Sequence, residues 1–356
     1  MFGTAAGLTM QIPTEPIGSI PRPRELVEAL LHGRVADQLY EDAVRDTIAR
    51  LEETGSPVVT DGEQRKPSFA TYPLEQRDGL APDGVVIPFE DGHTRQFPRL
   101  TRGPFRYGVY ADSYLEGAKR YATRPIKQAV ISASALSLLY PEDGIDGYPR
   151  SVFLDDLVRE AETDIRRCLR RGAATVQIDF TEARLSLKLD PSGALLRGFV
   201  DLNNRVLERF DESERRRIGV HTCPGGDLGA THSAGVDYAD LLPTLFELRA
   251  GAFYVQLASE PNRRKVLELI RECLGPRQRI FVGVIDPLDP EVEVPEHVCD
   301  RVLEAAEYIP RDRLGSTDDC GFSPFADDTS TARDVTFEKI RARVAGTRLA
   351  ASVLGR

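Results

Sequence analysis

His221 and Cys223 stand two residues apart at the end of an apolar run, in the stretch IGVHTCPGGD. Alternate side chains of a β-strand point to the same face, so an imidazole and a thiol at this spacing can face one point. Imidazole nitrogen and thiolate sulfur are ligands that zinc prefers, and Cys320, in DDCG, can supply a second sulfur. The pattern predicts a zinc-type site. The alternative is that these residues are ordinary buried core.

The other cysteines and histidines carry less signal. The chain has five cysteines, an odd and small number that does not indicate a disulfide framework. We expect buried apolar roles, inside helices, for Cys168, Cys273 and Cys299. Of the remaining histidines, we expect His32, His93 and His297 at the surface, whereas His232 follows the His-x-Cys strand closely enough to reach its site from a loop.

Eight short, β-branched runs, most of them followed by a stretch of helical period, indicate alternating strands and helices. The runs are 17–20, 57–61, 127–132, 175–179, 218–222, 253–258, 280–286 and 314–318. Helical period is clear from Leu154 and from Asn262, with Gly275 as the expected C-cap. Eight such units predict an α/β fold, a (β/α)₈ TIM barrel, with an open sheet as the alternative. Alternating runs and turn residues over 71–121 predict a β-hairpin insertion after the second strand, within one unit spanning 1–356.

Polar residues gather where these strands end, which is where barrel enzymes place their active sites. Helix capping explains a single Asp or Ser at such a position. The collected set favours a site: Ser19, Asp61, Glu63, Asp179, His221, Cys223, Gln256, Glu260, Asp286, Asp318, Asp319 and Cys320.

The composition excludes several classes of protein. The net charge of -10 argues against a nucleic-acid or anionic-membrane partner, since such surfaces are held by Lys and Arg. The first residues, MFGTAAGLTMQIPTEP, lack the basic and apolar regions of an export signal, and no run approaches the length of a membrane span. We expect a cytoplasmic protein with reduced thiols. Its oligomeric state is not specified by the sequence.

Five ordered motifs, IGSIPRP, TDGEQRK, QIDFTEAR, HTCPGGD and DDCGF, resemble the catalytic barrel of the cobalamin-independent methionine synthase family. The resemblance implies a (β/α)₈ barrel that binds one Zn²⁺ and transfers a methyl group to the thiol of homocysteine, giving methionine. It places the zinc ligands on His221, Cys223 and Cys320. It places binding of the amino and carboxyl groups of homocysteine on Ser19, Glu63 and Asp179.

The chain departs from the family pattern at the fourth zinc ligand. The family's glutamate at the end of the sixth strand corresponds to Gln256 here, and Glu260 lies four residues later. An amide oxygen is a poor zinc ligand. Either Glu260 serves as the fourth ligand, which is the reading we prefer, or three protein ligands leave a position for water or substrate.

The methyl donor is the second point of departure. The chain has no tryptophan, the residue on which the full-length synthase stacks its folate, and it shows one barrel where that enzyme has two. The donor is therefore 5-methyltetrahydrofolate, a methylcorrinoid or another small compound. Alternatives to methionine synthesis are alkyl transfer to another small thiol, as in epoxide:coenzyme M transferases, and non-catalytic thiol binding. A porphyrinogen decarboxylase-type barrel is disfavoured because its members lack the paired zinc thiolates.

Overall fold

The computed structural model describes residues 12–33 and 35–355. Residues 1–11 lie outside the described residues. They make up most of the amino-terminal stretch in which we expect no export signal. None of the helices in the described ranges combines the length and the hydropathy that a membrane-spanning segment requires.

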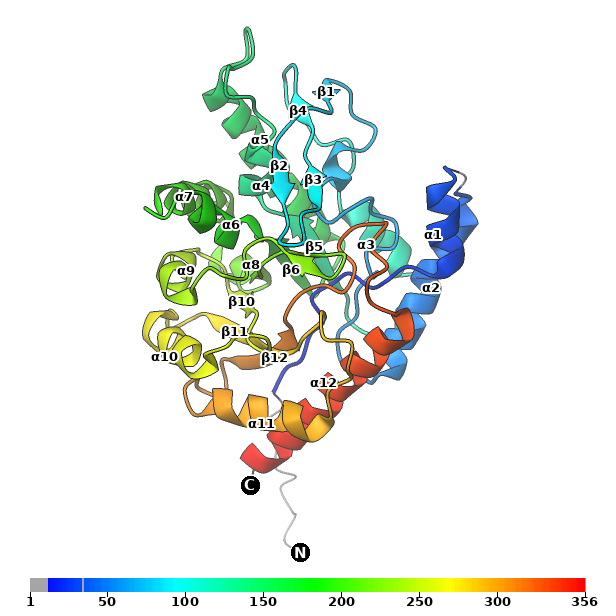
Figure 1. Cartoon of the computed structure of the whole chain (residues 1–356), viewed down its shortest axis with the longest axis vertical. Helices are drawn as coiled ribbons and strands as arrows, with labels where there is room; N and C mark the ends of the chain where they lie inside the picture. Colours follow the sequence, from blue (N-terminus) through cyan, green and yellow to red (C-terminus); the bar gives the residue numbers. More distant parts are fainter. Residues whose placement is uncertain (1–11, 34, 356) are drawn as a thin grey trace, which may run out of the picture.

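Six parallel strands form the central sheet (Figure 1). In sheet order they are β12 (Leu314–Asp318), β11 (Arg279–Ile285), β10 (Ala252–Val255), β7 (Ile218–Thr222), β6 (Thr175–Asp179) and β5 (Lys127–Ile131). All of their residues except Arg279 are buried, as expected for a parallel sheet covered on both faces. The six later strands predicted from the sequence are thus confirmed: β6, β7 and β12 match the predicted ranges, and β5, β10 and β11 have ends that differ by one to three residues.

Two extended segments close the sheet into a barrel. The first segment contains Thr14 and Ile20, and its Thr14 forms a parallel bridge with Ser316 of β12. The second segment contains Val59 and Gly62, and its Val59 forms a parallel bridge with Ile126, the residue before β5. The two segments also contact each other, because the Ile20 N–H donates to the Gly62 carbonyl over 3.0 Å. The ring of eight segments confirms the (β/α)₈ barrel and excludes the open sheet.

The prediction of full strands at 17–20 and 57–61 was wrong in extent. Each segment holds one isolated bridge, and the first of them lies at Thr14, before the predicted range. Proline has no N–H to donate to a strand ladder, and Pro13, Pro16 and Pro21 interrupt the first segment. Apolar character alone therefore overestimated the regular pairing of this segment.

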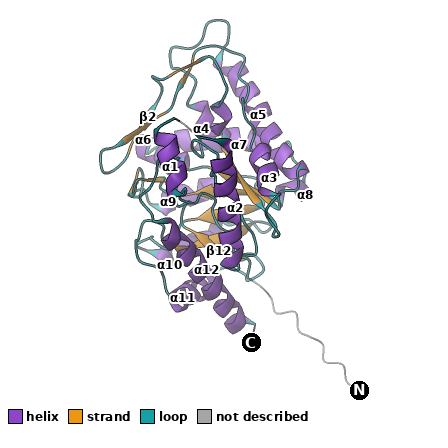
Figure 2. Ribbon diagram, turned by 90° about the vertical axis from the view of Figure 1, so that its right-hand side faces the viewer, coloured by secondary structure: helices purple, strands orange, loops and turns teal. Residues whose placement is uncertain are grey.

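Helices surround the barrel, outside the strands (Figure 2). Their bounds are α1 Arg24–Leu31, α2 Asp37–Glu53, α3 Asp112–Ala118, α4 Ala133–Ser137, α5 Arg150–Arg170, α6 Glu182–Leu189, α7 Ala194–Leu207, α8 Glu212–Arg215, α9 Tyr238–Leu245, α10 Arg263–Cys273, α11 Pro295–Ala306 and α12 Arg333–Leu354. Asn262 caps α10 as its spacing predicts, since its side chain accepts from the Lys265 N–H. Gly275 lies one residue beyond the C-cap, Leu274, so the predicted C-cap was displaced by one position.

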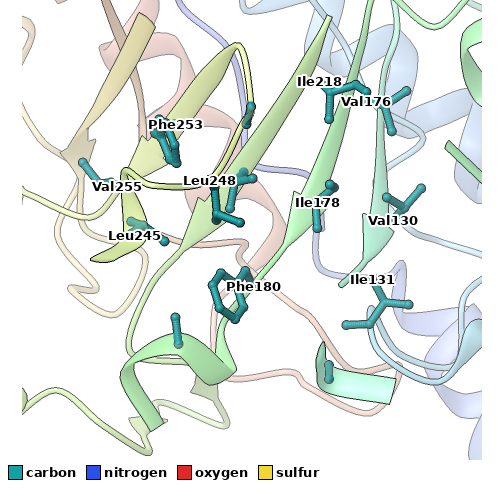
Figure 3. Packing of buried hydrophobic residues seen from close by; sticks show 14 of the residues in the cluster. Val130, Ile131, Val176, Ile178, Phe180, Ile218, Leu245, Leu248, Phe253 and Val255 are labelled. Atoms are coloured by element: carbon teal, nitrogen blue, oxygen red, sulfur yellow. The ribbon is translucent and has the colours of Figure 1, made fainter. Parts of the chain in front are cut away.

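The main core lies between the outer face of the strands and the helices (Figure 3). Alternate residues of β6, Val176 and Ile178, face this layer, as do Phe253 and Val255 of β10. Full burial of each such side chain contributes about 1.5–3 kcal/mol. Inside the barrel a separate small cluster of Ile17, Ala252, Tyr254 and Phe281 fills the space below the strand ends. The barrel interior is therefore packed with side chains, and the predicted site residues lie at the carboxyl ends of the strands that surround it.

The 71–121 segment contains two nested antiparallel pairs. β2 (Val86–Pro88) pairs with β3 (Thr94–Gln96), and β1 (Leu80–Ala81) pairs with β4 (Arg99–Leu100). The segment also holds a 3₁₀ turn, Tyr72–Leu74, and α3, which its pattern of alternating runs did not predict. A third antiparallel pair, β8 (Gly226–Asp227) with β9 (Ala230–Thr231), follows β7. Arg95 of β3 joins the two regions through an ion pair with Asp227.

Candidate functional site

The carboxyl ends of the strands bring the predicted residues together. Asp179, the last residue of β6, is in register with His221 of β7. Cys223 directly follows β7, and Cys320 follows β12 by two residues. Because parallel strands end on the same face of a barrel, residues far apart in the sequence meet there.

His221, Cys223 and Cys320 form a compact group that could hold a metal ion. Their ligand atoms all lie within 4.8 Å of one another. The two sulfur atoms are 2.9 Å apart, well beyond the disulfide bond length of about 2.05 Å, and both cysteines are free. Elsewhere in residues 12–33 and 35–355, no three His, Cys, Asp or Glu side chains come together in this way. An imidazole and two sulfurs form a donor set suited to zinc.

Hydrogen bonding orients the His221 ring. Its Nδ1 lies 3.3 Å from the backbone carbonyl oxygen of Tyr254 on the neighbouring strand β10. A carbonyl only accepts, so the Nδ1–H donates to it and Nε2 keeps its lone pair. Nε2 is buried and has no hydrogen-bond partner among the described residues. Such an arrangement fixes the tautomer that a metal-ligating histidine requires.

The two thiols differ in acidity. The hydrogen-bonding contact with Cys223 lowers the pKa of Cys320 well below its ordinary value, and the His221 ring lowers it further. Burial raises the pKa of Cys223. Cys320 is thus the more acidic of the two thiols.

One cavity collects the predicted acceptor-binding residues and two members of the His-Cys-Cys group. Ser19, Glu63, Asp179, His221 and Cys320 all line it. We call it the acceptor cavity. The convergence of these five residues from five separate parts of the chain is the main geometric feature of the site.

Ser19 is held against the segment that follows Cys320. Its Oγ accepts a hydrogen bond from the Ser323 N–H over 3.2 Å. A Cβ placed on Gly321 would lie 2.2 Å from this oxygen. Glycine at position 321 therefore permits the close approach of Ser19 to the chain beside Cys320.

Glu63 is already paired within the protein. Its Oε1 lies 2.8 Å from the Lys66 ammonium, and both side chains are almost completely buried. Lys66 also donates to the Ala129 carbonyl and lies over the Tyr72 ring. Lys66 thus balances the charge of Glu63 and fixes its position. Sequence reasoning assigned Lys66 no role, although it stands in the quoted motif TDGEQRK.

Asp179 is buried beside the His-Cys-Cys group. Its Oδ1 accepts a hydrogen bond from Gln177 over 2.7 Å. Burial, reinforced by the nearby Glu63 carboxylate, raises the pKa of Asp179 to about 7. A positive group bound next to Asp179 would favour its ionised form.

Arg184 is a second buried cation to which sequence reasoning assigned no role, although it ends the quoted motif QIDFTEAR. It forms an ion pair with Glu260 at 2.9 Å, and its other nitrogen donates to the carbonyls of Ala234 and Val236. The side-chain oxygen of Gln256 lies 3.5 Å from Arg184. The amide nitrogen of Gln256 donates to the Ser259 hydroxyl. Both candidates for a fourth metal ligand are therefore engaged by other groups.

The remaining acidic residues at strand ends have separate partners. Asp61 accepts from the Glu63 N–H, and Asp318 is paired with the fully buried Arg343. Asp319 accepts three backbone N–H bonds and the Ser259 hydroxyl, which fixes the chain after β10. Asp286 lies at the edge of a second cavity that also reaches Cys320. Capping and anchoring thus account for several of these positions.

The other histidines and cysteines follow the predictions in most cases. His32 and His297 are exposed, while Cys168 and Cys299 are buried and Cys273 is half-buried. His93 is only partly exposed, because it lies between Asp91 and Asp227. His232 packs against Gly225 and lines a neighbouring cavity rather than the acceptor cavity. Burial lowers the pKa of His232 to about 4, which keeps it neutral.

Comparisons with known proteins agree with this geometry. Residues 109–339 match the model of the family described as the cobalamin-independent synthase catalytic domain. A methionine synthase of Saccharolobus solfataricus is 23% identical over 354 residues, covering 97% of this chain and 96% of that protein. One from Sulfurisphaera tokodaii is 22% identical over 347 residues, covering 95% and 92%.

Solved structures show the same fold. A B12-independent methionine synthase from Shewanella sp. W3-18-1, in complex with selenomethionine, aligns with a TM-score of 0.76 at 20% identity, over 97% of this chain and 99% of that one. A putative B12-independent methionine synthase from Listeria monocytogenes aligns with a TM-score of 0.69 at 20% identity, over 96% and 99%.

The barrel, the His-Cys-Cys group at its strand ends and the family match together define a (β/α)₈-barrel methyltransferase of the methionine synthase class. The chain belongs to the cobalamin-independent synthase catalytic-domain family.

Proposed function

We propose that this protein is a zinc-dependent methyltransferase acting on a thiol, and that the acceptor is homocysteine, giving methionine. The observation that carries the proposal is the acceptor cavity. It places Ser19, Glu63 and Asp179 around the same space as His221 and Cys320. We also propose that residues 1–356 act as one catalytic unit in a reducing, cytoplasmic setting, which suits its free cysteines.

The donor set fits zinc. His221 offers a buried Nε2 that has no hydrogen-bond partner among the described residues, and the ligand atoms of His221, Cys223 and Cys320 all lie within 4.8 Å of one another. We propose these three residues as the protein ligands. Zinc bound there would lower the pKa of a coordinating acceptor thiol, so that a thiolate exists at neutral pH.

The fourth coordination position is proposed to belong to the acceptor sulfur. Arg184 holds the Glu260 carboxylate at 2.9 Å, and breaking this largely buried ion pair would be costly. Gln256 offers only an amide oxygen. This arrangement favours an open position over the Glu260 ligand that the sequence alone led us to prefer.

The chain's own residues would orient the acceptor. The carboxylates of Glu63 and Asp179 suit an ammonium group, and the Ser19 hydroxyl can donate to a carboxylate. Lys66 keeps Glu63 in place through its 2.8 Å contact. Holding the amino acid at three points directs its thiol toward His221 and Cys320, and such positioning can contribute several kcal/mol to the rate.

Relatives support an amino acid of this size. The Shewanella synthase that shares this fold is described in complex with selenomethionine, the selenium analogue of methionine. The resemblance to the family implies 5-methyltetrahydrofolate or a methylcorrinoid as donor.

The direct test supplies the zinc-loaded protein with homocysteine and a donor labelled in its methyl group, 5-methyltetrahydrofolate or methylcobalamin. We expect labelled methionine, and none from Cys320→Ser. Parallel reactions with coenzyme M, with and without an epoxide, test the alternative acceptor. Alkylated coenzyme M without methionine would contradict the proposed acceptor. Homocysteine that binds but is not methylated by any donor would indicate a thiol-binding protein.

A further inference from the structure

Gln177 stands two residues before Asp179 on β6 and also lines the acceptor cavity. Val176 and Ile178, the alternate residues of this strand, face the helices (Figure 3), so Gln177 and Asp179 face the barrel interior. Gln177 is 0% exposed. A buried amide exchanges its hydrogen bonds with the protein or with a ligand, so both ends of the Gln177 amide require a partner.

One end of this amide is engaged by the protein. The Gln177 Nε2 donates to Asp179 Oδ1 over 2.7 Å. An ionised carboxylate only accepts, so the amide nitrogen faces Asp179 and the amide oxygen, Oε1, points away from that hydrogen bond. Asp179 therefore fixes the orientation of the amide.

The other end of the amide has no partner within the protein. Oε1 is buried and receives no hydrogen bond from the described residues. On the two neighbouring strands, the residues in register with Gln177 are Ala129 and Gly219, whose side chains carry no polar group. Among the described side chains that line the acceptor cavity, one other buried atom is in this state, His221 Nε2, the proposed zinc-binding nitrogen. Because burying an acceptor without a donor is costly, Oε1 is suited to a donor that a ligand brings.

An ammonium group is the donor that fits this position. It carries three N–H donors and no acceptor. In the proposed function the carboxylates of Glu63 and Asp179 receive the ammonium group, and Gln177 lines the same cavity as both. Oε1 gives the third N–H an acceptor, and it adds no further negative charge to a site that already holds two carboxylates.

We propose that Gln177 is a further acceptor-binding residue, whose Oε1 accepts a hydrogen bond from the ammonium group of the thiol substrate. The proposal rests on the thiol methyltransferase function above and names the substrate class, an α-amino acid that carries a thiol. Gln177 acts at both ends of its amide, because Nε2 holds the Asp179 carboxylate while Oε1 contacts the ammonium group directly.

The same arrangement discriminates against thiols that have no amino group. Such a ligand, coenzyme M for example, would leave Oε1 without a donor and would bring no positive charge to Glu63 and Asp179. A site built to hydrogen-bond one group of a substrate rejects an analogue that lacks the group, since the site's own buried polar atoms then stay unpaired. A carboxylate or sulfonate on the ligand cannot donate to Oε1, whereas the Ser19 hydroxyl can donate to it.

The test compares homocysteine with 4-sulfanylbutanoate, the same thiol acid without the amino group. Isothermal titration calorimetry of the zinc-loaded full chain measures the dissociation constant of each ligand, and the ratio of the two constants gives the preference for the ammonium group. We expect the wild type to prefer homocysteine about a hundredfold, and Gln177→Met to lower that preference about tenfold through weaker homocysteine binding.

The matched control is Gln128→Met, on β5. Gln128 is equally buried, and its Oε1 also has no partner among the described residues, but it does not line the acceptor cavity. This variant should keep the wild-type preference.

The variant Gln177→Glu separates the two ends of the amide. It removes the N–H that holds Asp179 and keeps an oxygen in place of Oε1, so we expect its preference to stay within about threefold of the wild type. A preference lowered as far as in Gln177→Met would mean that Gln177 acts only through Asp179, and it would overturn the contact with the ammonium group.

The outcomes separate this proposal from the proposed function. Equal weakening of both ligands in Gln177→Met, or an unchanged preference, would overturn the role of Gln177, while homocysteine binding by the wild type would preserve the proposed function. Failure of the wild type to bind homocysteine would instead reject the proposed acceptor, and with it this role of Gln177.

Discussion

The sulfur atoms of Cys223 and Cys320 lie 2.9 Å apart, although the two residues are separated by 97 positions in the sequence. The barrel brings them together by placing the ends of β7 and β12 at one mouth, and His221 completes the group.

Loss of a ligand should remove the metal. We expect His221→Ala and Cys320→Ser to reduce zinc from about one ion per chain to a small fraction, because each removes one of three protein ligands. Metal analysis of the purified proteins measures this. Cys273→Ser, on α10 and away from the group, is the matched control and should keep its zinc. Full retention in both ligand variants would contradict the assignment.

Zinc affinity should change on substitution of Gln256 but not on substitution of Glu260, because the fourth coordination position is proposed to hold no protein ligand. Gln256→Glu adds a carboxylate near the metal and should tighten zinc binding by about tenfold or more. Glu260→Gln should leave zinc affinity unchanged yet lower stability by about 3 kcal/mol, because Arg184 then remains buried without its anionic partner. Chelator competition and urea denaturation separate the two effects. Loss of zinc from Glu260→Gln would identify Glu260 as a ligand.

The close approach of Ser19 to Gly321 should not tolerate a larger residue. In Gly321→Ala the new Cβ would lie 2.2 Å from Ser19 Oγ, so the chain beside Cys320 must shift. We expect a loss of about 1–3 kcal/mol in the free energy of unfolding and a higher KM for the acceptor. Gly117→Ala, in α3, is the control, since a Cβ there meets nothing within 4 Å. Equal stability and KM in both variants would contradict this role.

Glu182 should make stability depend on pH. It is buried, accepts from Ser132 and Ser134, and burial raises its pKa to about 7. A carboxyl with a raised pKa binds its proton more strongly in the folded state. Its contribution to stability is therefore complete at low pH and is lost as the pH rises from about 4.5 to 7, by about 1–3 kcal/mol.

The variant Glu182→Gln keeps a side-chain oxygen that can accept from Ser132 and Ser134, and it removes the titratable carboxyl group. Urea denaturation of both proteins at pH 5 and pH 8 should show the variant gaining stability relative to the wild type at the higher pH. Part of the wild-type slope should persist, because Asp179 also has a raised pKa. The same difference in stability at both pH values would contradict the assignment to Glu182.

Much of the fold could be predicted from the sequence because buried parallel strands leave a clear pattern. The run at 218–222 is apolar and short, ends in polar residues and matches β7 without change. The first segment could not be predicted as well, since its prolines prevent a ladder that its apolar residues suggested. Within 71–121, α3 packs against α2 and α5, and such contacts between distant segments leave no clear local periodicity.

The candidate site was predictable in its residue types but not in its partnerships. Strand alternation placed His221 and Cys223 on one face, and the structure puts Cys320 beside them. Nothing local to Glu260 indicates that Arg184 pairs with it, because these two residues come from chain segments that meet only in the fold. Lys66 stands three residues after Glu63, but the burial that makes their pair a fixed part of the site is a property of the fold.

The central claim is that the acceptor thiol binds directly to zinc held by His221, Cys223 and Cys320. Zinc X-ray absorption spectroscopy of the loaded protein, before and after addition of homocysteine, tests this most directly. The account predicts two sulfur neighbours before addition and three after it. A spectrum with an unchanged number of sulfur neighbours, at homocysteine concentrations that saturate binding, would contradict it.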